Sequence, residues 1–168
     1  MRRTSSFLIA GLLALTACGE KNEPAAPAEQ APTTGEPAMT EERAATPAAP
    51  KGTAITLGDS EFGSMLFDSR KQAIYIFELD EKDRTVCYDE CAEAWPPVLT
   101  KGKPRASNGV RQALLGTIKR RDGNRQVTYA GKPLYFYVNE SPGEVLCHNV
   151  YLNGGLWWVV GPDGERRA

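Results

Sequence analysis

The residues with the most distinctive chemistry in this chain are its cysteines and its single histidine. Cys87 and Cys91 are separated by three residues, and Cys147 is followed directly by His148. Three thiolates and one imidazole form a ligand set that suits zinc, and the Cys-x3-Cys spacing lies within the usual range. An adjacent cysteine and histidine are unusual as ligands of one tetrahedral ion, so zinc binding is the weaker interpretation of these residues.

A different chemistry is indicated for Cys18. Two arginines near the N-terminus precede nine mostly apolar residues, 7–15, which is typical of a secretory signal and too short to span a membrane. The run Leu-Thr-Ala that ends at Cys18 resembles the lipobox of bacterial lipoproteins, in which the signal peptide is removed and the cysteine is acylated. We therefore expect a signal peptide over 1–17 and a lipid-anchored protein of the bacterial cell envelope. No Asp follows Cys18 directly, which by analogy favours the outer membrane, with the protein facing the periplasm.

In an exported protein, Cys87 and Cys91 can form a disulfide. Residues four apart in a helix have Cβ atoms about 5–6 Å apart, whereas a disulfide needs about 3.8 Å. The bridge therefore requires Cys87 to lie before the first regular turn of the helix expected over 88–95. A bridge from Cys147 to either cysteine is the alternative. Acidic residues around Cys91 oppose a thiolate, which argues against a thiol-disulfide oxidoreductase.

The composition divides the chain into a tether and one domain. Residues 19–51 contain nine Ala, six Pro and six Glu, with no aromatic residue and no Val, Ile or Leu. Such a segment cannot bury enough apolar surface to offset the entropy lost on ordering. We therefore expect a lipidated N-terminus and disordered tether over 18–52, followed by one globular domain over 53–168.

Charge is unevenly distributed in the expected domain. Residues 59–93 carry ten acidic and four basic side chains, whereas residues 101–125 carry eight basic side chains and one acidic side chain. A basic stretch of this kind can orient a domain toward an anionic surface. We expect an anionic envelope component as a partner, in addition to the membrane that holds the lipid. Nucleic acid is a poor partner for an exported protein, and the sequence identifies no protein partner.

Short apolar segments separated by turn residues predict a mainly β domain, a compact antiparallel sheet or sandwich-like fold with one or two short helices. Trp157 and Trp158 are adjacent in the last expected strand, so they should point to opposite faces. Pro96 and Pro97 should end the first helix. We expect strands at 53–57, 64–67, 73–79, 117–121, 125–129, 134–138 and 156–160, and helices at 88–95 and, more weakly, at 110–115.

An internal repeat relates the two halves of the domain. In each copy an apolar residue precedes a tyrosine, an aromatic residue follows two places later, and an acid follows three places after that. Alternation along a strand places the two aromatic rings of a copy on one face, and the acid lies just beyond the strand end. Two aromatic core strands with acidic turn residues explain this pattern, and a ligand site is the alternative. The repeat residues are Tyr75, Phe77 and Asp80 in the first copy and Tyr135, Tyr137 and Glu140 in the second.

These motifs resemble the bacterial secreted lipoproteins built from a repeat with the signature Tyr-x-(Phe/Trp/Tyr)-x-x-Asp. That family commonly carries Cys-x-x-x-Cys followed by Trp-Pro-Pro, which matches the cysteine pair and Trp95 with its two prolines. The resemblance covers about 57–164 and implies an envelope location and a two-unit architecture, but no established activity. Glu140 in place of Asp, and the Cys147–His148 pair, depart from the family pattern.

We favour a non-catalytic binding or scaffolding module of unknown ligand, using exposed aromatic residues or the basic stretch. No nucleophile elbow, phosphate loop or dinucleotide fingerprint occurs in the sequence, and no cofactor is expected. The alternative is a periplasmic metal-binding or thiol-redox protein that uses Cys87, Cys91, Cys147 and His148.

Overall fold

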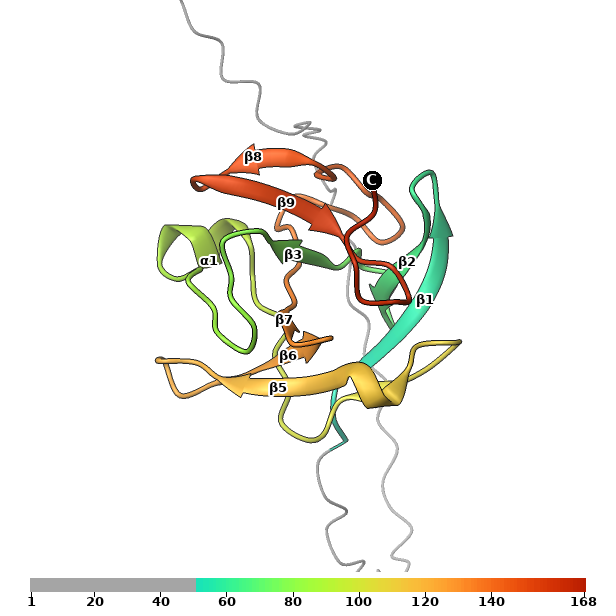
Figure 1. Ribbon diagram of the computed structural model, residues 1–168, viewed down its shortest axis with the longest axis horizontal. Coiled ribbons are helices and arrows are strands. Elements are labelled where there is room, and N and C mark those ends of the chain that lie inside the picture. Colours follow the sequence, from blue (N-terminus) through green and yellow to red (C-terminus); the bar gives the residue numbers. More distant parts are fainter. Residues whose placement is uncertain (1–50) are drawn as a thin grey trace, which may run out of the picture.

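The computed structural model describes residues 51–168, which fold into a mainly β domain as expected (Figure 1). The predicted signal peptide, Cys18 and the expected tether up to residue 50 lie outside the described residues. The elements in chain order are β1 (Ala54–Ser60), β2 (Gly63–Asp68), β3 (Tyr75–Phe77), α1 (Glu90–Ala94), β4 (Arg105–Ala106), the 3₁₀ turn η1 (Gln112–Leu114), β5 (Leu115–Lys119), β6 (Arg125–Tyr129), β7 (Lys132–Pro133), β8 (Val150–Leu152) and β9 (Gly155–Val159).

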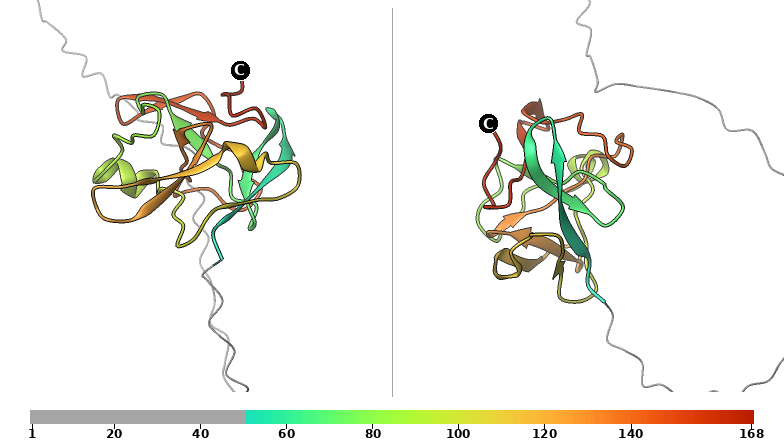
Figure 2. Two further views of the ribbon diagram at one scale, coloured as in Figure 1. Left: turned by 60° about the horizontal axis from the view of Figure 1, so that its bottom comes forward. Right: turned by 90° about the vertical axis from the view of Figure 1, so that its right-hand side faces the viewer.

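The strands form three small sheets, with the orders β2-β1-β4, β3-β9-β8 and β5-β6-β7. All pairings are antiparallel except that of β1 with β4, which is parallel. The long β1–β2 hairpin forms one side of the domain, as the right-hand view of Figure 2 shows. The expected hairpin around Asp-Gly-Asn is present as β5 and β6, because this turn sequence tolerates the backbone conformation that a tight hairpin requires.

The two repeats meet at a reciprocal contact between Tyr75 and Tyr135. The amide of Tyr75 donates to the carbonyl of Tyr135 at 2.9 Å, and the amide of Tyr135 donates back at 3.0 Å. These residues occupy the same position in the two copies of the repeat. The pairing of equivalent residues in both directions is what a local two-fold relation between the repeats requires.

The prediction of a strand over 134–138 is wrong. Strand β7 ends at Pro133, and the backbone that follows makes only isolated bridges. Beyond Leu134 its amides donate to two parts of the chain, Tyr75 and the segment 94–96, and no continuous ladder forms with either. The donors and acceptors are Tyr135 to Tyr75, Phe136 to Pro96 and Val138 to Ala94. The segment is nevertheless buried at Leu134, Tyr135 and Tyr137, which is why its sequence is apolar.

Both expected helices are shorter than the sequence indicates. The first is α1, a single turn and a half that ends before Trp95, and Pro96 and Pro97 prevent its continuation. The second, expected over 110–115, is only the 3₁₀ turn η1, and the chain passes from it directly into β5.

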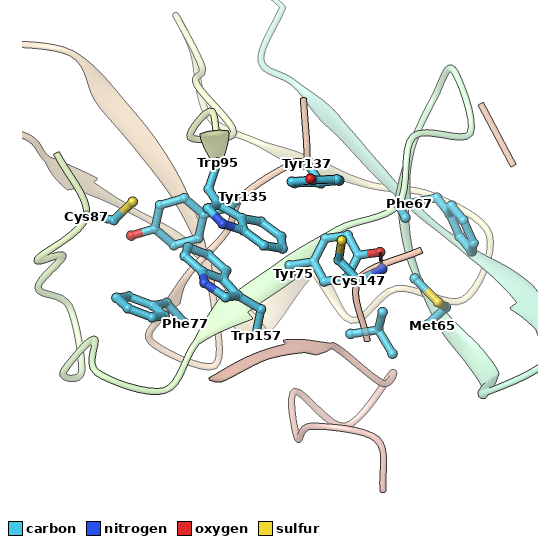
Figure 3. Close-up of a cluster of buried hydrophobic side chains, with 12 residues drawn as sticks. Met65, Phe67, Tyr75, Phe77, Cys87, Trp95, Tyr135, Tyr137, Cys147 and Trp157 are labelled. Carbon is cyan, nitrogen blue, oxygen red and sulfur yellow. Dashed lines mark hydrogen bonds between the residues drawn. The ribbon is translucent and has the colours of Figure 1, made fainter. Parts of the chain in front are cut away.

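The core contains two hydrophobic clusters. One is rich in aromatic rings and contains the four aromatic residues of the repeat together with two tryptophans (Figure 3). Trp157 stacks between Trp95, at a centroid distance of 3.8 Å, and Phe77, at 4.3 Å. Trp157 is fully buried and Trp158 is half-buried, so the adjacent tryptophans point to opposite faces of β9 as predicted. The second cluster is mainly aliphatic and includes Ile55, Leu66, Ile74, Val98, Val127, Leu134 and Val160.

Candidate functional site

The aromatic side chains of the repeat are almost entirely buried, although Phe77 contributes to the lining of a small hollow of about 200 Å³ beside Asp80 and Trp158. Tyr75 and Tyr135 are fully buried, and Phe77 and Tyr137 are 5% and 6% exposed. Together with the tryptophans they form the centre of the aromatic cluster shown in Figure 3. A ligand outside the protein therefore meets few of these rings, and the charged surface is the better place to search for a binding site.

Each repeat tyrosine forms its hydrogen bond with the acid of the other repeat. Tyr135 Oη donates to Asp80 Oδ2 at 2.6 Å. Tyr75 Oη donates to Glu140 Oε1 in the corresponding contact. The signature therefore joins the two copies to each other and is not completed within one copy. Glu140, which departs from the usual Asp, makes the same kind of contact as Asp80.

The two carboxylates also hold the loops that follow them. Asp80 Oδ1 accepts a hydrogen bond from the amide of Val86 at 2.8 Å, and Glu140 Oε1 accepts one from the amide of Leu146 at 2.6 Å. In each copy the amide belongs to the residue six positions after the acid. The first copy adds a hydroxyl, because Thr85 Oγ1 lies 2.5 Å from the oxygen of Tyr135.

Burial shifts the pKa values of these groups. Burial raises the pKa of Asp80 to about 6, although the hydrogen bonds from Tyr135 and Val86 act in the opposite direction. Burial also raises the pKa of Glu140. For Tyr75 and Tyr135, burial and the nearby carboxylates raise the pKa well above its usual value, so both remain phenols and act as donors.

Cys87 and Cys91 form a disulfide, with Cα atoms 5.3 Å apart. Helix α1 begins at Glu90, so Cys87 lies before the first regular turn, which is the geometry that the bridge needs. The bridge joins the incoming loop to the helix. Cys147 is a buried thiol at the position of the second repeat that corresponds to Cys87, and residue 151, which corresponds to Cys91, is a tyrosine.

The set of three cysteines and one histidine proposed as a metal or redox site is not assembled. The disulfide removes two of the four expected ligands as thiolates. His148 packs instead against Phe62, with ring centroids 4.1 Å apart, and lies edge-on to Trp158 at 5.5 Å. Within residues 51–168, no group of three or more His, Cys, Asp or Glu side chains could hold a metal ion.

One basic residue of the stretch 101–125 has a structural role that the sequence did not reveal. Arg120 is 3% exposed, and its guanidinium donates to Gln126 Oε1 at 2.6 Å and to the carbonyl of Cys87 at 2.8 Å. The neighbouring Arg121 is exposed and pairs with Asp89 at 2.6 Å. Both guanidinium groups lie over the ring of Tyr88. Two adjacent arginines in a polar hairpin carry no signal that tells the buried one from the exposed one.

Five other cations form a continuous surface that we call the basic groove: Lys51, Lys101, Lys103, Arg105 and Arg125. It consists of two adjoining hollows of about 620 and 330 Å³, and both are lined by Lys51 and Lys101. Neither hollow is lined by Asp or Glu. All five side chains are exposed, and none of them forms an ion pair with a carboxylate of the described domain.

The edge of the basic groove contains an unfavourable pair of like charges. Lys119 and Arg125 lie directly opposite each other in the β5–β6 register. Like charges at opposed positions destabilise a sheet. Arg125 donates a hydrogen bond to Thr117 Oγ1 at 2.8 Å, which holds the guanidinium on the surface without neutralising it. An anion bound here would remove the repulsion.

A further hollow of about 570 Å³ lies beside β1. Its lining is mixed, with hydroxyl and amide groups from Thr56, Ser69, Ser107 and Asn108. The ring of Phe67 packs closely against Gly58, where an added Cβ would lie 2.9 Å from the ring. The lining also contains charges of both signs, from Asp59, Asp68 and Lys71, so it favours no ligand of one charge.

Comparison with known proteins agrees with the two-unit structure. In the described part of the chain, no helix is both long enough and apolar enough to cross a bilayer. No curated protein and no solved structure matches the chain significantly. A family described as a secreted repeat of unknown function matches residues 56–99 and 116–161, together more than half of the 168 residues. These ranges contain the two copies that meet at Tyr75 and Tyr135, and the chain therefore belongs to this family of secreted repeats.

Proposed function

We propose that the protein is a lipid-anchored module of the bacterial cell envelope, held by Cys18 in the outer membrane and facing the periplasm. Its globular domain binds an anionic envelope component through the basic groove and catalyses no reaction. The observation that carries the proposal is the pair of adjoining hollows lined by five exposed cations and no carboxylate.

Electrostatics favours this surface as the binding site. The domain is nearly neutral overall, so a local excess of cations reflects their distribution and not the composition of the chain. Exposed lysines and arginines in proteins are usually interspersed with acids. The lining of the basic groove contains cations without acids, and the positive field of such a surface raises the local concentration of anions.

The residues that could otherwise support catalysis have structural partners, which favours a non-catalytic role. Asp80 and Glu140 hold the loops after them and accept hydrogen bonds from the repeat tyrosines. Cys87 and Cys91 are joined in the disulfide. Both carboxyl groups with a raised pKa are thus used in joining the two repeats.

Anion binding can be tested with a soluble polyanion such as polyphosphate. The protein carrying Cys18→Ala should bind it at low ionic strength and lose affinity steeply as salt is added. The double variant Lys101→Gln/Lys103→Gln should bind more weakly. The control variant Lys71→Gln/Lys82→Gln removes the same charge from outside the groove and should bind like the parent. Equal binding by all three proteins would contradict the proposal.

Lipid attachment can be tested separately. Metabolic labelling with a tritiated fatty acid should mark the wild-type protein and not the Cys18→Ala variant. Fractionation should place the wild type in the outer membrane and the variant in the soluble periplasmic fraction. A variant that stays in the membrane fraction would contradict lipidation at this cysteine.

A further inference from the structure

We propose that the anionic component bound by the basic groove is the phospholipid headgroup surface of the membrane that holds the lipid anchor, so that the domain docks on its own bilayer. The proposal rests on the proposed function, because it needs both the anchor at Cys18 and an anion-binding groove. It adds the identity of the partner and the orientation of the domain relative to the membrane.

The first argument is where the chain enters the domain. Thr53 is fixed to the loop that lines the groove, since its amide donates to Thr100 Oγ1 at 3.0 Å and its hydroxyl donates to the carbonyl of Leu99 at 2.7 Å. Gly52 is buried against the same loop, and an added Cβ would lie 1.9 Å from the carbonyl oxygen of Lys103. The described chain therefore begins within the groove, beside the loop that leads to β4 (Figure 1).

The second argument is the length of chain between the anchor and the groove. Cys18 and Lys51 are separated by 32 residues of low hydrophobicity. A random coil of that length spans about 30 Å. Binding between two tethered sites is intramolecular, with an effective concentration on the order of millimolar for short flexible linkers. Even weak attraction between the groove and anionic headgroups is then sufficient for docking, whereas other anionic polymers gain no such advantage.

The third argument is the match between the groove and a layer of phosphates. Phosphodiester headgroups present many negative charges in a plane, and the five cations are spread over two neighbouring hollows and not gathered around one point. Each Lys or Arg near an anionic bilayer strengthens binding by about fivefold. Arg125 at one end and Arg105 at the other can therefore contact different lipids.

The test is co-sedimentation of the Cys18→Ala protein with lipid vesicles, which separates the groove from the acyl chains. Vesicles of phosphatidylcholine containing about one third phosphatidylglycerol should bind the protein, and pure phosphatidylcholine vesicles should not. Removing two charges with Lys101→Gln/Lys103→Gln should weaken binding by about 30-fold. The control Lys71→Gln/Lys82→Gln should change binding by less than about threefold, because its lysines lie outside the groove.

The outcomes separate this inference from the proposed function. Binding to polyphosphate without binding to phosphatidylglycerol vesicles would overturn membrane docking and leave anion binding intact. Binding to neither probe would overturn both. Equal binding to neutral and anionic vesicles, or equal losses in the two double variants, would also overturn docking through the groove. Thermal unfolding of both variants checks that their folds are intact, and the exposure of all four lysines makes a large change unexpected.

Discussion

The exchange of partners between the repeats can be tested by double-mutant cycles. Tyr135→Phe removes one hydroxyl and keeps the ring, so the packing of the aromatic cluster is largely preserved. That hydroxyl donates to Asp80 at 2.6 Å and lies 2.5 Å from Thr85 Oγ1. A hydrogen bond to a charged group stabilises a protein by about 1.5–3 kcal/mol, and one between neutral groups by about 1 kcal/mol. We therefore expect Tyr135→Phe to lower the free energy of unfolding by about 3 kcal/mol.

The cycle that combines Tyr135→Phe with Asp80→Ala should give a coupling energy of about 2 kcal/mol, because these side chains are in direct contact. The matched cycle combines Tyr75→Phe with the same Asp80→Ala. Tyr75 belongs to the same repeat as Asp80 but donates to Glu140, so its coupling to Asp80 should be below about 0.5 kcal/mol. The contact between Asp80 and the amide of Val86 is lost in both cycles, so its cost cancels.

Urea unfolding of the full chain, monitored by tryptophan fluorescence with the disulfide intact, gives these coupling energies. The two cycles share one substitution, and each uses the same Tyr→Phe change. A same-repeat coupling equal to or larger than the cross-repeat coupling would refute the reasoning, because the signature would then be completed within one copy.

Three further outcomes follow from the described contacts. Burial raises the pKa of Asp80 from 3.8 to about 6, so the folded state binds this proton more tightly than the unfolded state does. The resulting stabilisation is complete below about pH 4, and about 3 kcal/mol is lost as the pH rises through 6. Asp80→Asn should flatten this part of the pH profile of urea unfolding. Replacing Cys87 and Cys91 by serine should lower the free energy of unfolding by about 2 kcal/mol in the same assay. This value is at the low end for disulfides because the closed loop is short. An unchanged midpoint of urea unfolding would contradict this prediction. Arg120→Ala should lower the free energy of unfolding by about 3 kcal/mol, because it leaves buried acceptors unsatisfied. Arg121→Ala removes an exposed ion pair and should lower it by less than about 0.5 kcal/mol in thermal or urea unfolding. Similar losses of stability in the two variants would show that the two arginines are equivalent.

Local patterns in the sequence predicted the parts of the fold that depend on neighbours along the chain. Alternation predicted that Trp157 and Trp158 point to opposite faces of the last strand, and the two prolines after Trp95 predicted the end of the helix. The helix geometry also predicted that a bridge from Cys91 requires Cys87 to lie before the first turn, as the structure has it. Each of these inferences involves residues only a few positions apart.

Features that depend on distant partners could not be predicted in this way. The repeat pattern shows that Tyr75 and Tyr135 occupy equivalent positions, but it does not show which acid each tyrosine reaches. The strand expected over 134–138 failed for a related reason, since its backbone has partners in several distant segments and none of them forms a ladder. Lys51 and Arg125 are far apart in the sequence, and only the folded chain brings them to one hollow.

The position of the basic groove relative to the repeats separates the scaffold from the binding surface. The signature tyrosines and acids join the two copies, and none of them lines the basic groove. Lys101, Lys103 and Arg105 lie between the two matched ranges, Lys51 precedes the first range, and only Arg125 lies within a repeat. Residues in a connection between repeats can change without disturbing the core, because they make few of its contacts. If the proposed function holds, the specificity of this chain resides mainly in the segments that the repeats hold in place, and substitutions there should alter binding while the stability of the aromatic cluster is retained.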